Sequence, residues 1–205
     1  MARAPTTTRA EITRAALLDA ALQEFSTFGF RRSSMESVAR RAGVSRATLY
    51  THWSGKNQLF RALVDQLHKE HLEAMESSLV VREAGLEARL YALLEARFLR
   101  FVELTSGSPH AAELYDQHGR LCGDVARASH ERSERLLART LRDAAAAGDV
   151  DLERIGLTAA RVAAVLLDCA HGAKGEDPSA TTPEQFRERL HHAVRVLVRG
   201  LQARP

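Results

Sequence analysis

A tight turn between two short helical patterns constrains this chain more than any other feature of its sequence. Residues 33–56 have the sequence SSMESVARRAGVSRATLYTHWSGK. Met35, Val38 and Ala39 follow the i, i+3, i+4 spacing and therefore share one helix face. Gly43 follows the last helical position, where glycine readily adopts the left-handed conformation that ends a helix. The segment therefore predicts a short helix, a turn and a second short helix.

The starts of these two helices carry residues suited to capping. Ser33, followed three residues later by Glu36, fits a capping box, but Ser34 could cap the first helix instead. The sequence leaves that choice open. Ser45 is expected to cap the second helix, with Leu49 as an apolar anchor.

The second helix presents a polar face without an acidic residue. Its exposed residues are predicted to be Arg46, Ala47, Thr48, Tyr50, Thr51 and His52. Each of these side chains donates a hydrogen bond or can touch a thymine methyl group. The pattern fits a helix-turn-helix that enters the DNA major groove. The alternative is an ordinary helical hairpin inside a bundle, and spacing alone does not decide between the two.

The distribution of charge favours the DNA-binding interpretation. Residues 1–56 hold nine Lys and Arg against four Asp and Glu, a net charge of +5, whereas residues 57–205 hold twenty against twenty-two, a net charge of −2. The basic excess is therefore confined to the segment that contains the two-helix motif. Such a patch is the expected footprint of a protein that contacts backbone phosphates.

Composition restricts the fold class and the compartment. The 205 residues are 45% hydrophobic but only 5% aromatic, so the core must be mainly aliphatic. Ala, Leu, Arg and Glu dominate, which favours helix. Two cysteines do not make a secreted disulfide framework, and no stretch approaches the ~18–20 apolar residues of a membrane span. We therefore expect a cytoplasmic protein that does not enter a membrane.

Apolar periodicity and the glycine and proline breaks predict an all-α fold of about nine helices without β-strands. The predicted helices cover residues 8–28, the two short helices of the motif, and residues 56–79, 86–104, 110–118, 121–147, 158–171 and 182–202. Thr158 and Thr182 are the expected caps of the last two helices, and Pro183 occupies the first position of the last one. The helix that starts at Lys56 is the expected link between the two halves of the chain.

The first three helices are predicted to form a compact unit. Its expected core consists of Leu18, Ala21, Leu22, Phe25, Phe30, Met35, Val38, Ala39, Val44 and Leu49. Phe28 falls on the same apolar stripe of the first helix, and Trp53 is expected to be buried rather than to contact a ligand.

The run MESVARRAGVSRATLYTHWSGKNQLF resembles the DNA-binding signature of TetR/AcrR-type transcriptional regulators, above all in its GVS, LY, HW and Lys56 positions. The resemblance covers residues 10–63, and the remaining two-thirds of the chain match only in the number and order of helices. It implies a DNA-binding domain at residues 1–55 and an effector-binding and dimerisation domain at residues 56–205. It also implies a homodimer through the last two helices, a palindromic operator in double-stranded DNA, and a small-molecule effector that releases a repressor.

Candidate DNA contacts follow from side-chain chemistry together with this resemblance. The candidates for base contacts are Arg46, Ala47, Thr48 and, more weakly, Thr51. Arg46 is the best of them because its guanidinium can pair with guanine O6 and N7, although it could instead contact only phosphate. The candidates for phosphate contacts are Ser45, Tyr50, His52 and Lys56. Lys56 also lies at a helix start whose free N–H groups favour an anion.

The sequence restricts the effector site far less. Candidate pocket residues are Leu63, Arg97, Phe98, Phe101, Leu114, Tyr115, His118, Leu137 and Leu166, each of which could equally be plain core. The pairs His68 with His71 and His118 with Cys122 have ligand-like spacing, but no third ligand is visible, so neither a metal nor another cofactor is expected. Redox sensing by Cys122 or Cys169 stays open.

Three alternatives to the ligand-controlled repressor remain. A helical-bundle enzyme is disfavoured because the chain has no phosphate loop, nucleophile motif or metal set. A constitutive DNA-binding regulator without effector control, and an activator, are both compatible with the same motif.

Overall fold

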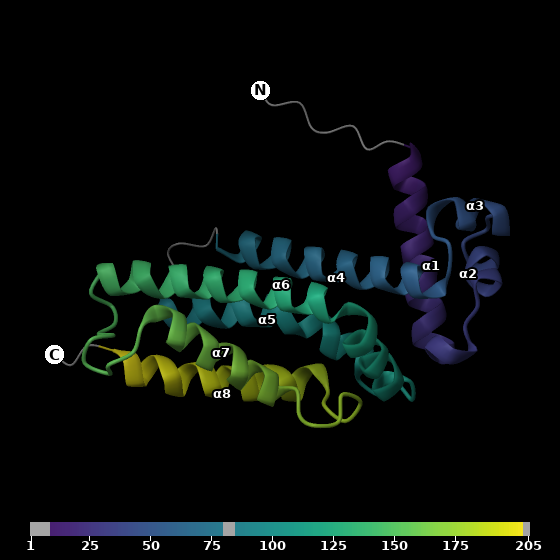
Figure 1. The fold of residues 1–205 in the computed structure, drawn as a ribbon. Coiled ribbons are helices and arrows are strands. Elements are labelled where there is room, and N and C mark those ends of the chain that lie inside the picture. The colour runs from purple at the N-terminus through teal and green to yellow at the C-terminus, as the bar shows by residue number, and fades with distance from the viewer. Residues whose placement is uncertain (1–8, 80–84, 203–205) are drawn as a thin grey trace. The chain divides into compact units, whose positions relative to one another are not determined.

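The structure, a computed structural model, describes residues 9–79 and 85–202, with the side chains described from Arg14 onward. The described chain contains eight helices and no strand beyond one isolated bridge between Val150 and Gln202. The helices are α1 (Arg9–Arg32), α2 (Met35–Arg41), α3 (Arg46–His52), α4 (Lys56–Ser78), α5 (Leu86–Thr105), α6 (Ala111–Ala146), α7 (Ala159–Ala173) and α8 (Pro183–Leu201) (Figure 1). The all-α prediction is confirmed.

The difference between about nine predicted helices and eight observed ones lies in α6. Two helices were expected over residues 110–118 and 121–147, separated near Gly119 and Gly123. The structure joins these two helices into one element across a kink at Cys122, whose dihedrals, φ −130° and ψ 18°, are not helical, so the predicted break is present as a kink. Each glycine inside a helix costs about 0.5–1 kcal/mol, which packing can offset, and the fully buried Cys122 is evidence of such packing.

The chain divides into two compact units. The first comprises the chain up to Gln66 together with Glu113–Gly123, and the second comprises Leu67–Ala112 and the chain from Asp124 onward. Helix α4 therefore begins in the first unit and ends in the second. The predicted boundary between residues 55 and 56 separates functions, whereas this division separates compact units. The predicted boundary therefore stays a prediction.

The first unit is held together by an aromatic cluster at the centre of its core. The rings of Phe25, Phe30 and Phe60 lie 5.1–5.6 Å apart between centroids. Ten core residues were predicted, and eight of them are buried, as is Trp53; Leu22 and Val44 are only partly buried.

One residue of the predicted apolar stripe is wrongly placed by the sequence argument. Phe28 is 45% exposed, whereas Phe25, one turn earlier, is 1% exposed. The chain leaves helical geometry directly afterwards, at Gly29 with φ 77°, so the end of the stripe turns away from the core. The exposed ring of Phe28 instead stacks with Arg41, whose guanidinium carbon lies 5.8 Å from the ring centroid.

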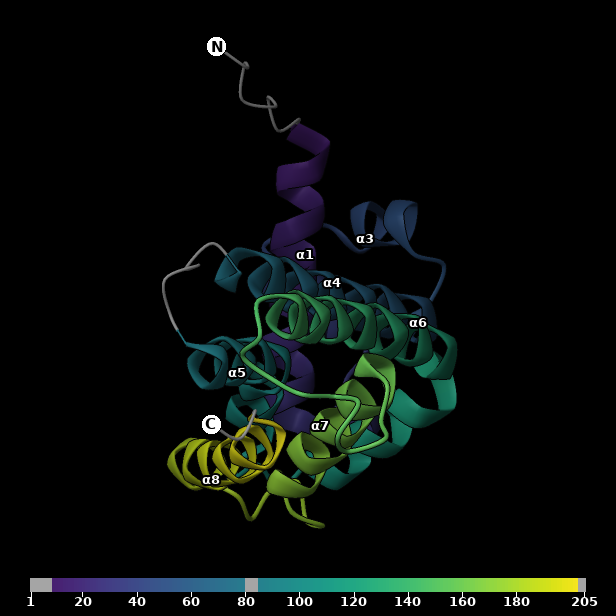
Figure 2. The same cartoon turned by 90° about the vertical axis from the view of Figure 1, so that its left-hand side faces the viewer.

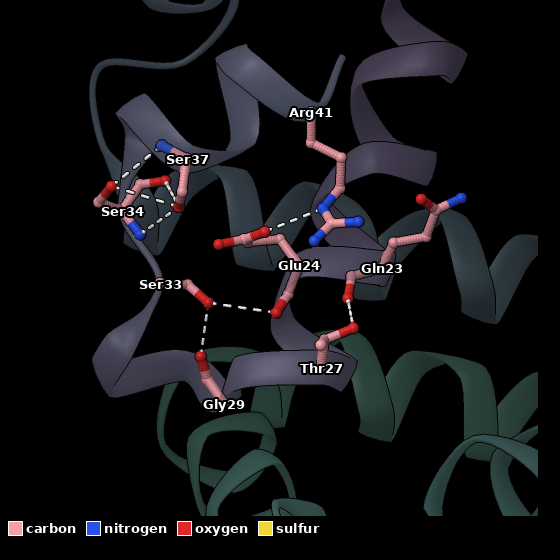
Figure 3. A network of polar contacts seen from close by, with 8 residues as sticks. All are labelled: Gln23, Glu24, Thr27, Gly29, Ser33, Ser34, Ser37 and Arg41. Carbon is pink, nitrogen blue, oxygen red and sulfur yellow. Dashed lines mark hydrogen bonds and ion pairs between the residues drawn. The ribbon is translucent and has the colours of Figure 1, made fainter.

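A network of polar contacts fixes α2 against α1 (Figure 3). Ser34 caps α2 by accepting from the Ser37 N–H at 3.0 Å, and Ser37 Oγ accepts from the Ser34 N–H at 3.0 Å. Ser33, the alternative cap, is buried and donates its hydroxyl to the Gly29 carbonyl at 2.6 Å. The open choice between the two serines is therefore decided by the bend at Gly29, which uses Ser33 to satisfy a carbonyl at the end of α1.

The second unit surrounds a large aliphatic core. Helix α5 packs along α8, and α7 lies beside α8 in both views (Figures 1 and 2). Thr158 and Thr182 cap α7 and α8 as predicted, and Pro183 opens α8. The apolar stripe of α8 is largely buried within the subunit, since Phe186, Leu190 and Val194 are at most 1% exposed.

Candidate nucleic-acid interface

Helix α3 is short, and it is held by the turn before it, by its N-terminal cap and by one buried side chain. Gly43 takes φ 67° and allows the sharp turn after α2. Ser45 then caps α3 as predicted, accepting from the Thr48 N–H at 3.0 Å. Leu49 is fully buried and anchors the helix to the core of the first unit. Because isolated helices of this length are unstable in water, this anchor and the cap are what keep α3 in place.

The residues predicted to contact DNA bases lie on the outward face of α3, but they differ in exposure and in the hydrogen bonds that they already make. Arg46 and Ala47 are exposed, and Thr51 is exposed as well. The Thr51 hydroxyl, however, donates to the Thr48 carbonyl at 2.7 Å, and Thr48 Oγ1 lies 2.8 Å from the Ser45 hydroxyl oxygen. The two threonine hydroxyls therefore have local partners, and Arg46 and Ala47 are the most accessible of the predicted base contacts.

Arg46 has two partners of its own at the surface. Its Nη1 lies 2.9 Å from Glu36 Oε1, and its guanidinium carbon lies 5.2 Å from the centroid of the Tyr50 ring. A hydrogen bond with Tyr50 and the charge of Glu36 raise the pKa of Arg46 above its ordinary value. Both members of the ion pair are well exposed, which limits the strength of the pair and leaves Arg46 able to exchange Glu36 for another acceptor.

The remaining candidates for phosphate contacts differ in their exposure and in their contacts within the protein. Tyr50 is 38% exposed, and the half-buried His52 ring lies 5.5 Å from that of Trp53. Trp53 is buried and lies beneath Arg14, whose guanidinium carbon is 5.3 Å from the indole centroid. Ser45 is exposed, but its hydroxyl is already used in capping.

Lys56 has an intramolecular role that the sequence argument did not anticipate. Its Nζ donates to the carbonyls of Phe30 and Ser33, at 2.8 Å each, and approaches the carbonyl of Arg31 at 3.4 Å. The ammonium also lies 4.4 Å from the centroid of the Phe30 ring. Partial burial lowers the pKa of Lys56 below its ordinary value. Its assignment to a DNA phosphate stays a prediction, and these contacts count against it.

The ion pair between Glu24 and Arg41 was missed entirely by the sequence argument. Arg41 Nε lies 2.9 Å from Glu24 Oε2, and the Glu24 side chain is only 6% exposed (Figure 3). The two residues border a groove that also contains Phe28, Arg32 and Arg40. A signal for Glu24 existed, since it lies four residues after Ala20 on the buried face of α1.

The nine predicted pocket residues fall into two groups. Leu63, Leu114, Tyr115 and His118 belong to the first unit, and Arg97, Phe98, Phe101, Leu137 and Leu166 belong to the second. Leu137 and Leu166 are fully buried in the aliphatic core, whereas Tyr115 is 50% exposed. Arg97 lies near Phe98, and a fourth residue, Lys174, which the sequence argument did not single out, lies near both Phe98 and Phe101.

The histidine and cysteine pairs do not extend into a metal-binding set within residues 9–79 and 85–202. The His68 and His71 rings lie 6.1 Å apart between centroids. Cys122 and Cys169 are not joined in a disulfide; Cys122 is buried and Cys169 is partly buried. In the same part of the chain, no helix combines the length and apolar character needed to cross a membrane.

The fold and the exposed face of α3 define a helix-turn-helix protein. Comparison with known proteins identifies the family. The family model described as bacterial regulatory proteins, tetR family, matches residues 17–63. The chain is 30% identical over 157 residues to the HTH-type transcriptional regulator TtgR of Pseudomonas putida, an alignment that covers 71% of this chain and 73% of TtgR.

Two further relatives differ in how much of their length is matched. The uncharacterized HTH-type transcriptional regulator YhgD of Bacillus subtilis is 38% identical over 85 residues, which cover 40% of this chain and only 44% of YhgD. The structure of SmeT, the repressor of the Stenotrophomonas maltophilia multidrug efflux pump SmeDEF, superposes with a TM-score of 0.64 at 21% identity. That match covers 93% of this chain and 90% of SmeT, and at this identity it shows the fold alone.

The chain belongs to the TetR family of bacterial transcriptional regulators. It is therefore a DNA-binding regulator of transcription and not an enzyme, which confirms the resemblance seen in residues 10–63.

Proposed function

We propose that the protein is a repressor that binds a palindromic operator as a homodimer in the cytoplasm and leaves it when a small-molecule effector binds. The observation that carries the DNA part is the outward face of α3, which is acid-free, exposed at Arg46 and Ala47, and fixed by the buried Leu49. A rigidly held face of this kind suits the major groove, because base contacts need precise placement of few side chains.

Within this proposal the predicted contacts divide by chemistry. Arg46 pairs with a guanine, Ala47 contacts a thymine methyl group, and Thr48 and Thr51 make weaker base contacts once their hydroxyls reorient. Phosphates are contacted by Tyr50, His52 and Ser45, in that order of availability; Lys56 contributes mainly by holding the end of α1.

Dimerisation through α7 and α8 is supported by apolar side chains that remain outside the subunit core. Val196 on α8 is 71% exposed and Val165 on α7 is 40% exposed, so both are available for contact with a second copy. Two copies joined in this way would place their α3 helices in successive major grooves, about 34–36 Å apart along the DNA.

Control by an effector is proposed from the family and from the way α4 is built. SmeT, whose fold this chain shares, is described as the repressor of a multidrug efflux pump, and α4 here begins in the first unit and ends in the second. An effector that binds one conformation of the second unit more tightly shifts the population between DNA-bound and free forms. A preference of about 5.5 kcal/mol is enough to reverse a 1:99 equilibrium.

The test begins with selection of bound sequences from random duplex DNA, followed by affinity measurements on the selected site. We expect a palindrome, two protomers per site, and loss of sequence preference in the Arg46→Ala variant. A matched control is Arg135→Gln, which removes a surface charge from the second unit. Selection of no sequence, or equal loss in both variants, would count against specific recognition by α3.

A reporter gene placed behind the selected site separates repression from activation and from constitutive binding. Repression that is relieved by added compounds supports the proposal. Repression that no compound relieves favours the constitutive regulator, and stimulation of transcription identifies an activator.

A further inference from the structure

The second unit contains a cluster of basic side chains, three of which lie near one aromatic ring. Phe98 is 2% exposed. The guanidinium carbon of Arg97 lies 5.1 Å from the centroid of its ring, and Nζ of Lys174 lies 5.2 Å from the same centroid. The His171 ring is 4.8 Å away and nearly perpendicular to Phe98. We call Arg97, Lys174, His71 and His171, which come from α4, α5 and the end of α7, the basic cluster.

The two cations of the basic cluster have no anionic partner within the described residues. Arg97 is 93% buried, as its 7% exposure shows, yet its Nε donates only to the neutral hydroxyl of Ser133, at 3.1 Å. Neither Arg97 nor Lys174 forms an ion pair with a carboxylate in this part of the chain. Burying an unpaired charge is costly, and native proteins normally place a counter-charge beside it.

Every member of the cluster has a pKa below its ordinary value. Burial lowers the pKa of Arg97 to about 10, and burial together with the charge of Arg97 lowers the pKa of Lys174 to about 8. Burial, followed by the charge of Arg97, lowers the pKa of His71 to about 4. Burial, followed by the charge of Lys174 and to a smaller extent that of Arg97, lowers the pKa of His171 to about 4. The charge of Arg97 therefore contributes to the lowered pKa values of Lys174, His71 and His171.

A second, independent observation is the unused hydrogen-bonding capacity next to Arg97. His71 is 7% exposed, and neither of its ring nitrogens has a hydrogen-bond partner among the described residues. The hydroxyl oxygen of Ser129, 4% exposed, lacks a partner as well, and Ser129 lies one turn before Ser133 on α6. Buried polar groups are nearly always satisfied, so unpartnered ones beside an unpaired cation indicate a site that something else completes.

We propose that the basic cluster is the head-group subsite of the effector, and that the effector is an anion, with an organic carboxylate joined to an apolar body as the best fit. This inference rests on the proposed control by an effector. Arg97 uses Nε for Ser133, so its two Nη groups remain for the bidentate pairing that carboxylates make with guanidinium. Lys174 supplies a second charge. The aromatic faces of Phe98 and Phe101, both within 5.2 Å of Lys174 Nζ, suit an apolar body.

The test compares carboxylates with their neutral amides on the full-length protein without DNA. The probes are benzoate with benzamide and octanoate with octanamide, and inorganic phosphate is added as a third anion. Binding is followed by calorimetry and by the thermal midpoint, which a ligand at ten times its Kd should raise by about 3–6 °C. We expect the carboxylates to bind and the amides to bind at least tenfold more weakly. Phosphate that displaces the carboxylates and binds more tightly would assign a phosphate-bearing effector within the same anionic class.

Variants connect this binding to the named residues. Arg97→Met should weaken carboxylate binding about 10–100-fold and, because it removes an uncompensated buried charge, raise the thermal midpoint of the ligand-free protein by about 2–4 °C. Lys174→Met, at a partly buried position, provides a second variant whose folding is less at risk, and should also weaken binding. Arg135→Gln removes an exposed charge and should change neither quantity.

The outcomes separate this inference from the proposed function. Carboxylates that bind the wild type no better than amides, or that bind Arg97→Met and Lys174→Met as tightly as the wild type, overturn the anionic subsite. A neutral compound that releases the operator while anions do not bind leaves effector control standing and removes only this inference. Conversely, anions that bind through Arg97 without changing operator affinity establish the subsite and count against control of DNA binding through it.

Discussion

Replacing Glu36 by Gln is expected to strengthen operator binding. In the free protein Glu36 Oε1 holds Arg46 Nη1 at 2.9 Å, and Arg46 is the foremost candidate for a base contact. The carboxylate therefore competes with DNA for the guanidinium. Its negative charge also lies beside the surface that approaches the phosphates, so its removal acts in the same direction.

The magnitude follows from the exposure of the pair. The Arg46 side chain is 63% exposed and that of Glu36 is 47% exposed. An ion pair this open to solvent contributes about 0–1 kcal/mol, whereas a bidentate contact between arginine and guanine contributes about 1–3 kcal/mol of discrimination. Arg46 therefore leaves Glu36 when DNA binds. Removing the competition should tighten binding by up to about fivefold, and Arg46→Ala should weaken it by about 5–150-fold.

The assay is a double-mutant cycle measured by fluorescence anisotropy on the selected operator at fixed salt. The cycle comprises the wild type, Glu36→Gln, Arg46→Ala and the double variant. If the competition operates, the gain from Glu36→Gln shrinks once Arg46 is absent. Glu131→Gln, which makes the same change of charge in the second unit, controls for net charge and should leave affinity nearly unchanged.

Two results would refute the reasoning. An equal gain in the presence and absence of Arg46 would mean that the carboxylate acts on phosphates alone. A loss of affinity in Glu36→Gln would mean that the ion pair holds Arg46 in its DNA-contacting conformation instead of competing for it.

Three further predictions concern stability and are checked by urea unfolding. Lys56→Met removes the donor that satisfies the carbonyls at the end of α1 and should lower the free energy of unfolding by about 1–3 kcal/mol; an unchanged midpoint contradicts this role. Phe25→Ala should cost about 3–5 kcal/mol, because Phe25 is 1% exposed and contacts two other rings; a loss below 1 kcal/mol would mean that the cluster collapses around the gap. Burial lowers the pKa of His71 from 6.5 to about 4, so the unfolded chain protonates first and stability falls as pH drops from 6.5 towards 4, by about 3 kcal/mol in total. His71→Phe should flatten that part of the pH profile, and an unchanged slope would argue against a buried neutral ring.

The elements that depend on near neighbours were predicted well from the sequence. Ser45, Thr158 and Thr182 cap the helices at which they were expected, and Gly43 adopts a positive φ. Each of these features involves atoms within about four residues, where the order of side chains decides the geometry. The same holds for the outward face of α3, because helical periodicity fixes which side chains lie opposite the buried Leu49.

Features that depend on where helices end or bend were predicted less well. The sequence could not choose between Ser33 and Ser34, because the choice depends on the bend at Gly29 and on which carbonyl then needs a donor. It predicted two separate helices with a break near Gly119, whereas the structure joins them across a kink at Cys122.

The sequence by itself determined that this chain is helical, that a helix-turn-helix lies between residues 33 and 56, and that Arg46 faces outward from it. Only the tertiary structure decided what Arg46, Lys56 and Arg97 touch. Lys56 holds the end of α1, and Arg97 and Lys174 both lie near the ring of Phe98. The physical reason is range: capping and periodicity are properties of a few consecutive residues, whereas burial and electrostatic potential arise from residues that only folding brings together.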